Sequence, residues 1–312
     1  MGEAGGVAPS YSLIADRFPV ASRGRALAIY SLGVPLGLGV GTALGGWIAA
    51  NFGWRAAFVA VAAPGLVLGA LLLLLVREPA RVSASSDAAA TSLGSAVTMF
   101  LASPQLLLVA LSSALGAFAC YGLMSWISAY LIRVLGMSLT EIGSWLSVTL
   151  AVGLGLGIWA SGALADRLGA HDRRMYAWIP GIALALGAPV LFAATTFDDW
   201  RLALPLFGLA LGLSIFYLAP SVAILTALVA PNQRSTASAL MLLCLNLIGL
   251  GGGPFAIGAV SVWALAAHGS QSLRIALAAL SPMFLVAALA FAWSAAALGR
   301  GETDARRAIS AS

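Results

Sequence analysis

Long apolar stretches, separated by short segments that carry charged residues or prolines, divide the chain from one end to the other. Most are at least about twenty residues long, which is enough for a helix to cross the hydrocarbon core of a bilayer. Only helices and closed barrels satisfy their backbone groups in lipid, and these stretches are too long for barrel strands. We therefore predict nine transmembrane helices, at 2–16, 24–50, 54–76, 105–132, 139–165, 175–196, 202–229, 235–266 and 275–298.

The composition indicates lipid rather than water as the surrounding solvent. Hydrophobic residues make up 61% of the 312 residues and charged residues only 9%, whereas ordinary soluble domains have about 45–50% and about 25%. A chain this apolar cannot cover its surface with polar groups in water. We expect an all-α, polytopic membrane protein in contact with the lipid bilayer.

The positive charges indicate orientation. All sixteen basic residues are arginines, and they fall singly or in pairs between the apolar stretches, unlike the clustered basic surface that nucleic-acid binding needs. Twelve lie on one side of the predicted helices and four, Arg55, Arg133, Arg201 and Arg274, on the other. By the positive-inside rule the side with twelve arginines is cytoplasmic. The C-terminus is then expected in the cytoplasm of a bacterial-type inner membrane, and no nucleic-acid partner is expected.

An internal repeat suggests how the helices are organised. With an offset of 211 residues, Ala8-Pro9-Ser10 aligns with Ala219-Pro220-Ser221, and Arg23 aligns with Arg234. The first three predicted helices then repeat as the last three, while the middle three have no partner. The economical hypothesis is a twelve-helix protein of two six-helix halves that lacks its first three helices. Chance similarity among helices rich in Ala and Gly is the alternative.

A polar connection at 78–103 divides the chain into two predicted bundles. The expected organisation is the remainder of an N-terminal bundle at 1–77, the cytoplasmic loop at 78–103, a six-helix bundle at 104–299 and a cytoplasmic tail at 300–312.

Sequence motifs resemble a known family. The segment 162–174 runs Gly162-Ala163-Leu164-Ala165-Asp166-Arg167-Leu168-Gly169, and Arg173 and Arg174 follow. It resembles the cytoplasmic loop signature of the major facilitator superfamily, Gly-x-x-x-Asp-Arg-x-Gly followed by basic residues, although Ala170 stands where an arginine is usual. Asn246-Leu247-Ile248-Gly249, Gly253-Pro254 and Ser272-Leu273-Arg274 are similar to the spinster-like branch of that superfamily.

The resemblance implies a fold and a function. The fold would be a twelve-helix, two-bundle architecture, truncated here at the N-terminus. The function would be secondary active transport of a small organic solute, coupled to protons, by alternating access between the two bundles of a monomer. A truncated fragment that transports nothing remains an alternative, and an intramembrane enzyme is a remote one.

The resemblance also places the substrate cavity along the predicted helices 2–16, 105–132 and 202–229. Their polar and aromatic residues are the cavity candidates, joined by one asparagine from the helix 235–266: Tyr11, Tyr121, Ser125, Trp126, Tyr130, Ser214, Tyr217, Ser221 and Asn246. Interhelical hydrogen bonding is the alternative role of each. Ionisable groups inside a membrane are functional candidates by default, so Glu3 is the candidate for proton coupling.

Two further groups of residues have predicted roles. The loop signature and the helix start that it is expected to contact would form a cytoplasmic gate, made of Gly162, Asp166, Arg167, Gly169, Arg173, Arg174, Arg23 and Arg25. Alternatively, these arginines only set the topology. Small residues spaced by four form a smooth helix face that lets a neighbour approach closely; the candidates are Gly33, Gly37, Gly41 and Gly45, with Gly249, Gly253 and Pro254 in the matching helix. Hinge motion is the alternative for these.

Enzymatic signatures do not appear in the sequence. Both histidines, His171 and His268, lie in predicted loops, and neither a His-Glu-x-x-His motif nor a phosphate-binding Gly-x-x-x-x-Gly-Lys-Ser/Thr loop is present. We therefore expect a protein that is not an enzyme, with neither a cofactor nor a metal.

Overall fold

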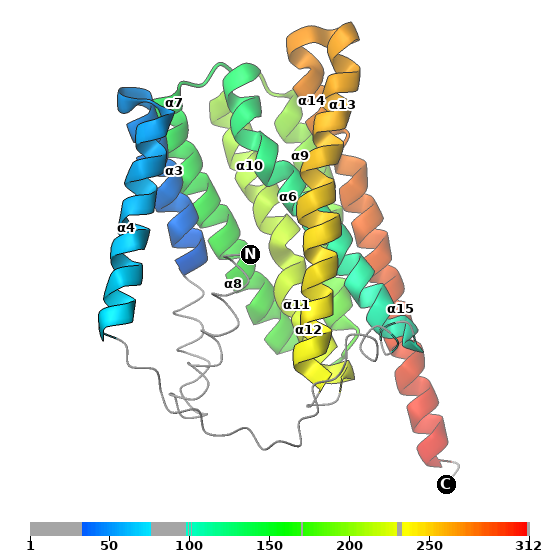
Figure 1. Cartoon of the computed structure of the whole chain (residues 1–312). Coiled ribbons are helices and arrows are strands. Elements are labelled where there is room, and N and C mark those ends of the chain that lie inside the picture. The colour runs from blue at the N-terminus through cyan, green and yellow to red at the C-terminus, as the bar shows by residue number, and fades with distance from the viewer. Residues whose placement is uncertain are drawn as a thin grey trace.

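The computed structural model describes residues 33–75, 102–169, 171–229 and 233–310, together with Thr98 and Phe100. These residues form helices that run mostly side by side along one axis (Figure 1). The α-helices are α3 (Gly33–Phe52), α4 (Trp54–Leu75), α6 (Pro104–Arg133), α7 (Leu139–Glu141), α8 (Ser147–Gly169), α9 (Met175–Thr196), α10 (Trp200–Ser214), α11 (Leu218–Leu228), α12 (Arg234–Cys244), α13 (Gly253–His268), α14 (Ser272–Ala278) and α15 (Ser281–Ser310).

Short segments with other helical geometry join several of these helices end to end. The segments η2 (Ile142–Leu146) and η5 (Leu245–Gly252) are π-helical, and η3 (Ile215–Tyr217) and η6 (Gly269–Gln271) are 3-10 helices. The predicted segments 139–165, 202–229 and 235–266 therefore correspond to α7–η2–α8, α10–η3–α11 and α12–η5–α13. π-helical turns inside α-helices often mark functional sites.

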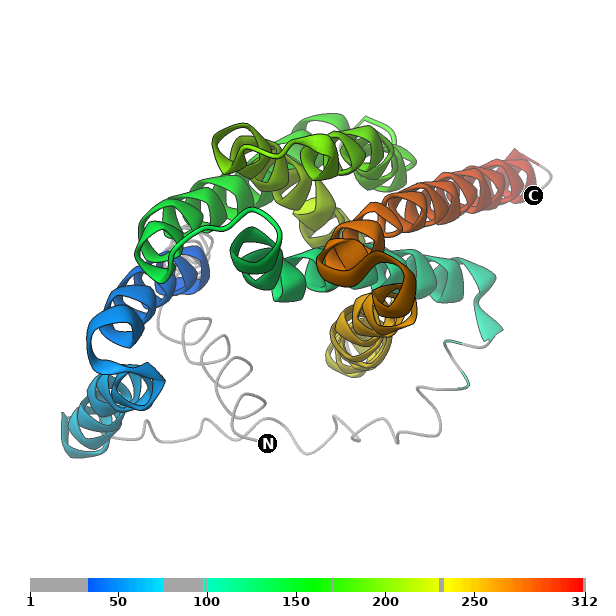
Figure 2. The same ribbon diagram turned by 90° about the horizontal axis from the view of Figure 1, so that it is seen from above.

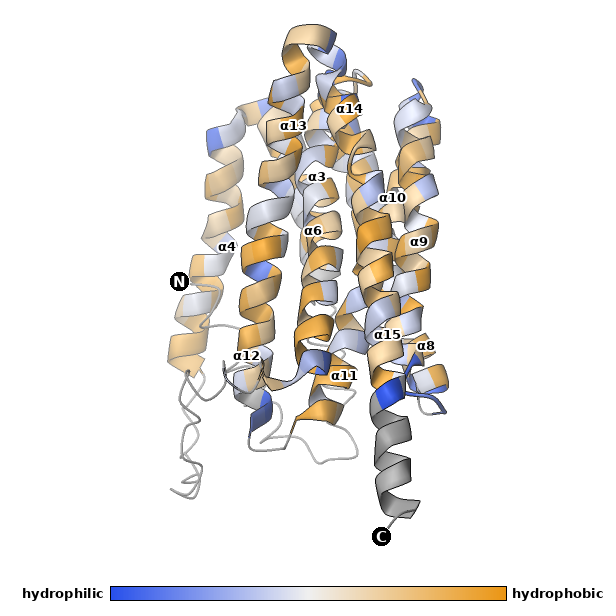
Figure 3. Cartoon of the chain, turned by 90° about the vertical axis from the view of Figure 1, so that its right-hand side faces the viewer, coloured by the Kyte–Doolittle hydropathy of each residue, from blue (hydrophilic) through white to orange (hydrophobic). Residues whose placement is uncertain are grey.

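Membrane-spanning helices are present, as expected. Six helical stretches of the described residues are long and apolar enough to cross a bilayer, and the shorter apolar helix Leu36–Phe52 lies in α3. The last of the six, Thr236–Arg300, turns back on itself at η6, where Gly269 takes a φ of 52°, a value that favours glycine. The middle of the bundle is apolar and polar residues gather near its ends (Figure 3). The chain is an integral membrane protein.

Two predicted boundaries need correction. The segment 275–298 is not one helix: α14 ends at Ala278 and α15 begins at Ser281. Pro282 has no N–H to donate to the Ala278 carbonyl, so the helix is interrupted here. The predicted helix end at residue 298 is also wrong, because α15 continues to Ser310. The predicted segment 2–16 lies outside the described residues, and 24–50 is described only from Gly33.

The helices from α6 onward pack around a common core, and α3 and α4 lie at one side of it (Figure 2). The largest fully buried side chains of the described residues belong to this core and include Tyr130, Phe207, Tyr217, Phe284 and Phe291. In contrast, α4 has no buried residue and packs against α3. The helix α3 also packs against α7, η2 and α8. It therefore joins the two groups of helices in the part of the chain that the structure describes.

Local signals in the sequence explain where several helices begin. Ser103 precedes Pro104 and accepts a hydrogen bond from the Leu106 N–H, which caps α6. Ser138 and Glu141 form a reciprocal capping box at α7. Asp199 caps α10 by accepting from the Arg201 N–H at 2.9 Å. These caps explain why α6, α7 and α10 begin at the residues where they do.

Candidate transport site

The first candidate region is the contact of α6 with η5 and α13. A Cβ atom placed on Gly253 would lie 2.5 Å from the Phe118 carbonyl oxygen, and one placed on Gly249 would lie 2.6 Å from the Ala117 Cβ. The structure therefore places both glycines against α6, at a separation that no larger residue would permit. The two glycines thus bring η5 and α13 into close contact with α6.

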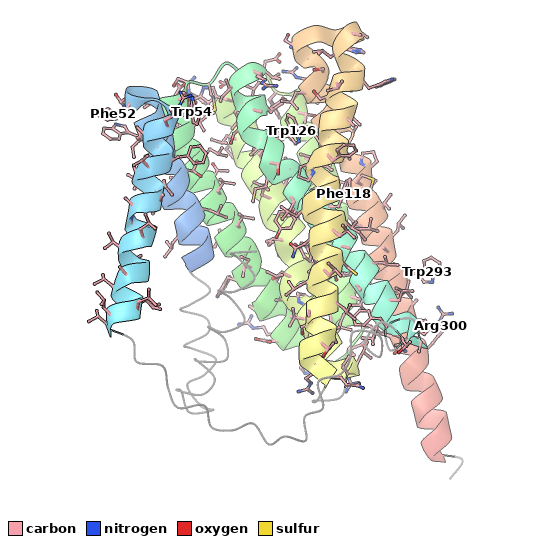
Figure 4. The ribbon with its side chains drawn as sticks, in the orientation of Figure 1. Phe52, Trp54, Phe118, Trp126, Trp293 and Arg300 are labelled. Atoms are coloured by element: carbon pink, nitrogen blue, oxygen red, sulfur yellow. The ribbon has the colours of Figure 1, made fainter. Side chains whose placement is uncertain are left out.

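Trp126 joins α6 to α13 at this contact. Its indole Nε1–H donates to the Pro254 carbonyl oxygen at 2.9 Å, and a Cβ on Gly258 would lie 3.0 Å from the Trp126 ring. Figure 4 shows Trp126 in the upper half of α6 beside α13. Gly258 thus leaves room for the Trp126 ring, and the Trp126 side chain connects α6 to α13.

Three cavity candidates remain accessible in this region. Ser125 and Asn246 are exposed, and Tyr121 is half-buried. Tyr121 and Ser125 are four residues apart on α6 and so share a face. Asn246 lies in η5, the π-helical segment that packs against α6. A hydroxyl pair and an amide on adjacent helices can donate to and accept from a polar solute.

Two other tyrosine candidates lie in the packed interior. The Tyr130 hydroxyl is 3.4 Å from the Thr195 carbonyl oxygen, and its ring meets Phe207 edge-on at 5.3 Å. The Tyr217 ring lies against Gly116, where a Cβ would come 3.0 Å from the ring. Both side chains are buried. They hold helices together in this structure, and we do not include them in the proposed cavity.

Buried serines also connect helices. Ser113 donates to Ser221 at 2.6 Å, and the Ser112 and Ser294 hydroxyls are 2.8 Å apart. Ser214 donates to the carbonyl oxygen of Leu211 within its own helix. Ser214 and Ser221 are therefore packing residues here. Ser112 and Ser113 were not among the predicted site residues, although an adjacent pair of hydroxyls in the middle of an apolar stretch is a signal that the sequence contains.

The loop signature, 162–174, lies at the C-terminal end of α8 and in the loop that leads to α9. The Tyr176 ring fills the space next to Gly169, and the Arg174 guanidinium lies over Gly299 of α15. Asp172 accepts from the Arg174 N–H at 2.8 Å. The start of α9 thus contacts the end of α8 and the interior of α15.

The remaining gate candidates are mostly exposed. Gly162 is half-buried, and Asp166, Arg167 and Arg173 are exposed. Their expected partners, Arg23 and Arg25, lie outside the described residues, as do Glu3 and Tyr11.

The predicted glycine face of α3 meets no other described residue. Among the described residues, nothing lies within 4 Å of a Cβ placed on Gly33, Gly37, Gly41 or Gly45. The close approach instead uses two other glycines. A Cβ on Gly39 would lie 3.0 Å from the Ala151 Cβ, and one on Gly46 would lie 2.8 Å from the Gly143 Cα. The seven-residue spacing returns Gly39 and Gly46 to one face, nearly opposite the predicted one.

No cluster of three or more His, Cys, Asp or Glu side chains that could hold a metal ion occurs within the described ranges.

Comparison with known proteins decides the family. The family model of the Major Facilitator Superfamily matches residues 1–254. The chain belongs to the Major Facilitator Superfamily. An MFS-type efflux pump of Mycolicibacterium smegmatis is 34% identical over 299 residues, which are 95% of this chain and 69% of that protein.

Further similarity supports the spinster-like branch of this facilitator family. Protein spinster homolog 1 of Homo sapiens is 28% identical over 285 residues, covering 84% of this chain and 53% of that protein. A crystal structure of a bacterial homolog of the human lysosomal transporter Spinster, in an inward-facing and unoccupied conformation, matches with a TM-score of 0.74 and 26% identity. The match covers 95% of this chain and 74% of that chain. This facilitator therefore spans about half the length of the human relative.

Proposed function

We propose that this facilitator is a secondary active transporter that moves a small organic solute across the membrane by alternating access and is driven by protons. The family consists of membrane transporters rather than enzymes. The observation that carries the proposal is the contact between the two groups of helices. It is made by glycines of α3 and η2 that bring the backbones together.

A contact made by glycines, with no large side chains between the backbones, allows two groups of helices to rock against each other. The Gly46–Gly143 contact lies toward the end of the bundle opposite the C-terminus (Figure 1). The similarity to an inward-facing spinster homologue supports the interpretation that this end is closed. We propose that the other end, which carries the loop signature, opens to the cytoplasm. Asp166, Arg167 and Arg174 would then act in its closure with Arg23 and Arg25.

The solute would bind beside α6. Tyr121 and Ser125 on α6 and Asn246 on η5 supply accessible hydrogen-bonding groups, and Tyr11 would join them from the N-terminal bundle. We propose Glu3 as the proton carrier, because a carboxyl group in a membrane-spanning helix changes its protonation when its hydration changes. The proposed substrate class is an aromatic or amphiphilic organic solute. Tyrosine side chains present both an apolar ring and a polar hydroxyl.

Ethidium, an aromatic organic cation, is a suitable first probe because one relative is an efflux pump. Cells that express this chain should retain roughly half as much ethidium as cells with an empty vector, or less, if the pump outcompetes passive entry. A protonophore should abolish the difference, and Glu3→Gln should do the same at equal expression. Equal dye retention with and without the chain would contradict export of this solute class. Transport that survives the protonophore would contradict proton coupling.

A further inference from the structure

A groove lies between α8 and α10, away from the α6–α13 contact. At its floor, glycines of α8 and α10 lie against one another. A Cβ on Gly153 would lie 2.6 Å from the Gly208 carbonyl oxygen, and one on Gly212 would lie 2.7 Å from the Gly153 carbonyl oxygen. Because the two backbones are in contact at the floor, the larger side chains on either side of the glycines form the walls of the groove. They enclose a volume of about 490 Å³.

The walls of the groove are apolar. The α8 wall includes Val148, Val152 and Leu156, and the other wall includes Leu209 of α10 and Phe216 of η3. The only lining side chain with a hydroxyl is Thr149, which already donates to the Trp145 carbonyl oxygen at 2.9 Å. No lining side chain carries a charge or an unused hydrogen-bond donor. The chemistry of the walls therefore selects a hydrocarbon occupant.

The dimensions of the groove correspond to one leaflet. The wall formed by α10 and η3 runs from Pro205 to Phe216, and eleven residues of helix rise about 16 Å. Half of a hydrocarbon core of about 30 Å is about 15 Å. Val152, Leu156 and Leu209 on the rims are 51%, 60% and 51% exposed. In a membrane-spanning helix such exposed apolar surfaces contact lipid, so the groove is open to acyl chains along its length.

A positive charge stands at one end of the groove. Arg201 precedes Pro205 by one turn and lies on the same face of α10. The Trp200 ring lies 5.0 Å from the Arg201 guanidinium carbon, and the Trp145 ring centroid is 6.2 Å from that of Trp200. Tryptophan side chains are enriched at the level of lipid headgroups. Arginine binds phosphate oxygens through charge-assisted hydrogen bonds.

The acidic side chains near Arg201 already have partners. Glu141 accepts hydrogen bonds from the Ser138 N–H at 2.9 Å and from the Ser138 hydroxyl at 2.8 Å. Asp199 accepts from the Arg201 backbone N–H. Within the described ranges the guanidinium of Arg201 has no carboxylate within 4.0 Å. The guanidinium is therefore not held in an ion pair and can bind an anion in the headgroup region.

We propose that the α8–α10 groove binds one acyl chain of an anionic phospholipid, with the lipid phosphate at Arg201. The lipid comes from the leaflet opposite the C-terminus, because α10, whose second residue is Arg201, begins at that end of the bundle (Figure 1). This site is separate from the proposed transport site beside α6. A bound chain fills the space that the glycine contact creates and so stabilises the packing of α8 against α10.

Photolabelling tests the acyl-chain part of the proposal. The 312-residue chain would be reconstituted in vesicles of phosphatidylcholine and phosphatidylglycerol in equal amounts, with a diazirine group on the acyl chain of the phosphatidylglycerol. Mass spectrometry should find label concentrated in peptides that carry residues 148–160 and 205–216. Leu209→Trp should fill the groove and lower this label by about tenfold, as expected if a few buried methylene groups are displaced.

Leu289→Trp on α15, where the side chain is 70% exposed, is the matched control and should leave the groove label unchanged. Label on α15 from bulk lipid should persist in the Leu209→Trp variant, which shows that the variant is folded and inserted. Label spread evenly over α15 and the groove would overturn the proposal. So would groove label that Leu209→Trp does not reduce.

A second variant tests the headgroup part. Arg201→Gln should remove the preference of the groove for labelled phosphatidylglycerol over labelled phosphatidylcholine. Arg133→Gln, an exposed arginine at the same end of the bundle, should not. Equal labelling by the two lipids in the unmodified chain would overturn the assignment of the phosphate to Arg201.

Discussion

Two helix contacts of this protein use glycine in the same way and differ in what surrounds the glycine. At the α6–α13 contact, Gly253 lies against the Phe118 carbonyl, and the Trp126 indole donates to Pro254 beside it. At the α3–η2 contact, Gly46 lies against Gly143. There, the side-chain hydrogen bonds of α3 that the described residues make stay within α3: Thr42 bonds to Leu38 and Asn51 to Trp47.

The difference corresponds to the proposed motion. Within the group of helices from α6 onward, α6 is bonded to its neighbours by Trp126 and by the hydroxyls of Ser112 and Ser113. Interhelical hydrogen bonds in a membrane contribute about 0.6 kcal/mol on average, and each one across a moving contact would have to be broken in every cycle. Backbone contact alone leaves α3 able to separate from α8. We expect changes in the first contact to affect stability and changes in the second to affect conformation.

The largest effect is expected from Gly253→Val. Its branched side chain would overlap the Phe118 carbonyl oxygen, and overpacking of this kind costs about 1–3 kcal/mol. The midpoint of thermal unfolding in detergent should fall by about 5–10 °C. Gly251→Val is the control, because a Cβ there would meet only the Asn246 carbonyl oxygen at 3.6 Å, an ordinary contact. Equal midpoints for the two variants would show that the contact at Gly253 is not tight.

Gly46→Val should separate the two groups of helices without unfolding either. The new side chain would overlap Gly143 and the Leu139 carbonyl oxygen, so α3 must move away from η2. Spin labels at positions 52 and 139, in a background with both native cysteines replaced by alanine, should show a longer distance by double electron–electron resonance. Gly45→Val is the control, since nothing among the described residues lies within 4 Å of a Cβ there. An unchanged distance in Gly46→Val would contradict a closed contact at this point.

Trp126→Phe should have the smallest effect. It keeps an aromatic ring over Gly258 but removes the hydrogen bond to Pro254. The loss of one such bond and of part of the ring should cost about 1 kcal/mol, which lowers the unfolding midpoint by about 2–4 °C. Trp159→Phe serves as the control because that side chain is 71% exposed. A midpoint that falls no further in Trp126→Phe than in Trp159→Phe would argue against the tie between α6 and α13.

Much of the fold could be predicted from apolar length alone. The helix predicted at 175–196 has the same bounds in the structure, and 105–132 differs from α6 by one residue at each end. The prediction failed at 275–298, because hydropathy does not register the break before Pro282. The loop signature and the match to the superfamily agree. Motifs in loops can be recognised without knowledge of the packing around them.

The candidate site was predicted less well than the fold. The sequence identified Gly249 and Gly253, which the structure places against α6, but it did not identify Gly39 and Gly46, the α3 glycines that lie against described residues. It also grouped Tyr130 and Tyr217 with Tyr121, although the first two are buried. Spacing shows which residues share a helix face, and it does not show what that face contacts. Whether a polar side chain lines a cavity or joins two helices therefore depends on the residues that it contacts, which its spacing in the sequence does not show.

The sequence by itself determined that lipid surrounds this protein, where its described helices lie and which family it belongs to. These follow from properties of single segments, because each apolar stretch satisfies its own backbone hydrogen bonds in a membrane. The tertiary structure decided which face of each helix meets another helix. It assigned Gly39 and Gly46 to the contact of α3 with α8 and η2, and Gly153 and Gly208 to the floor of the proposed lipid groove. Close packing of two backbones depends on both helices of a pair, so the sequence of one helix alone does not show it.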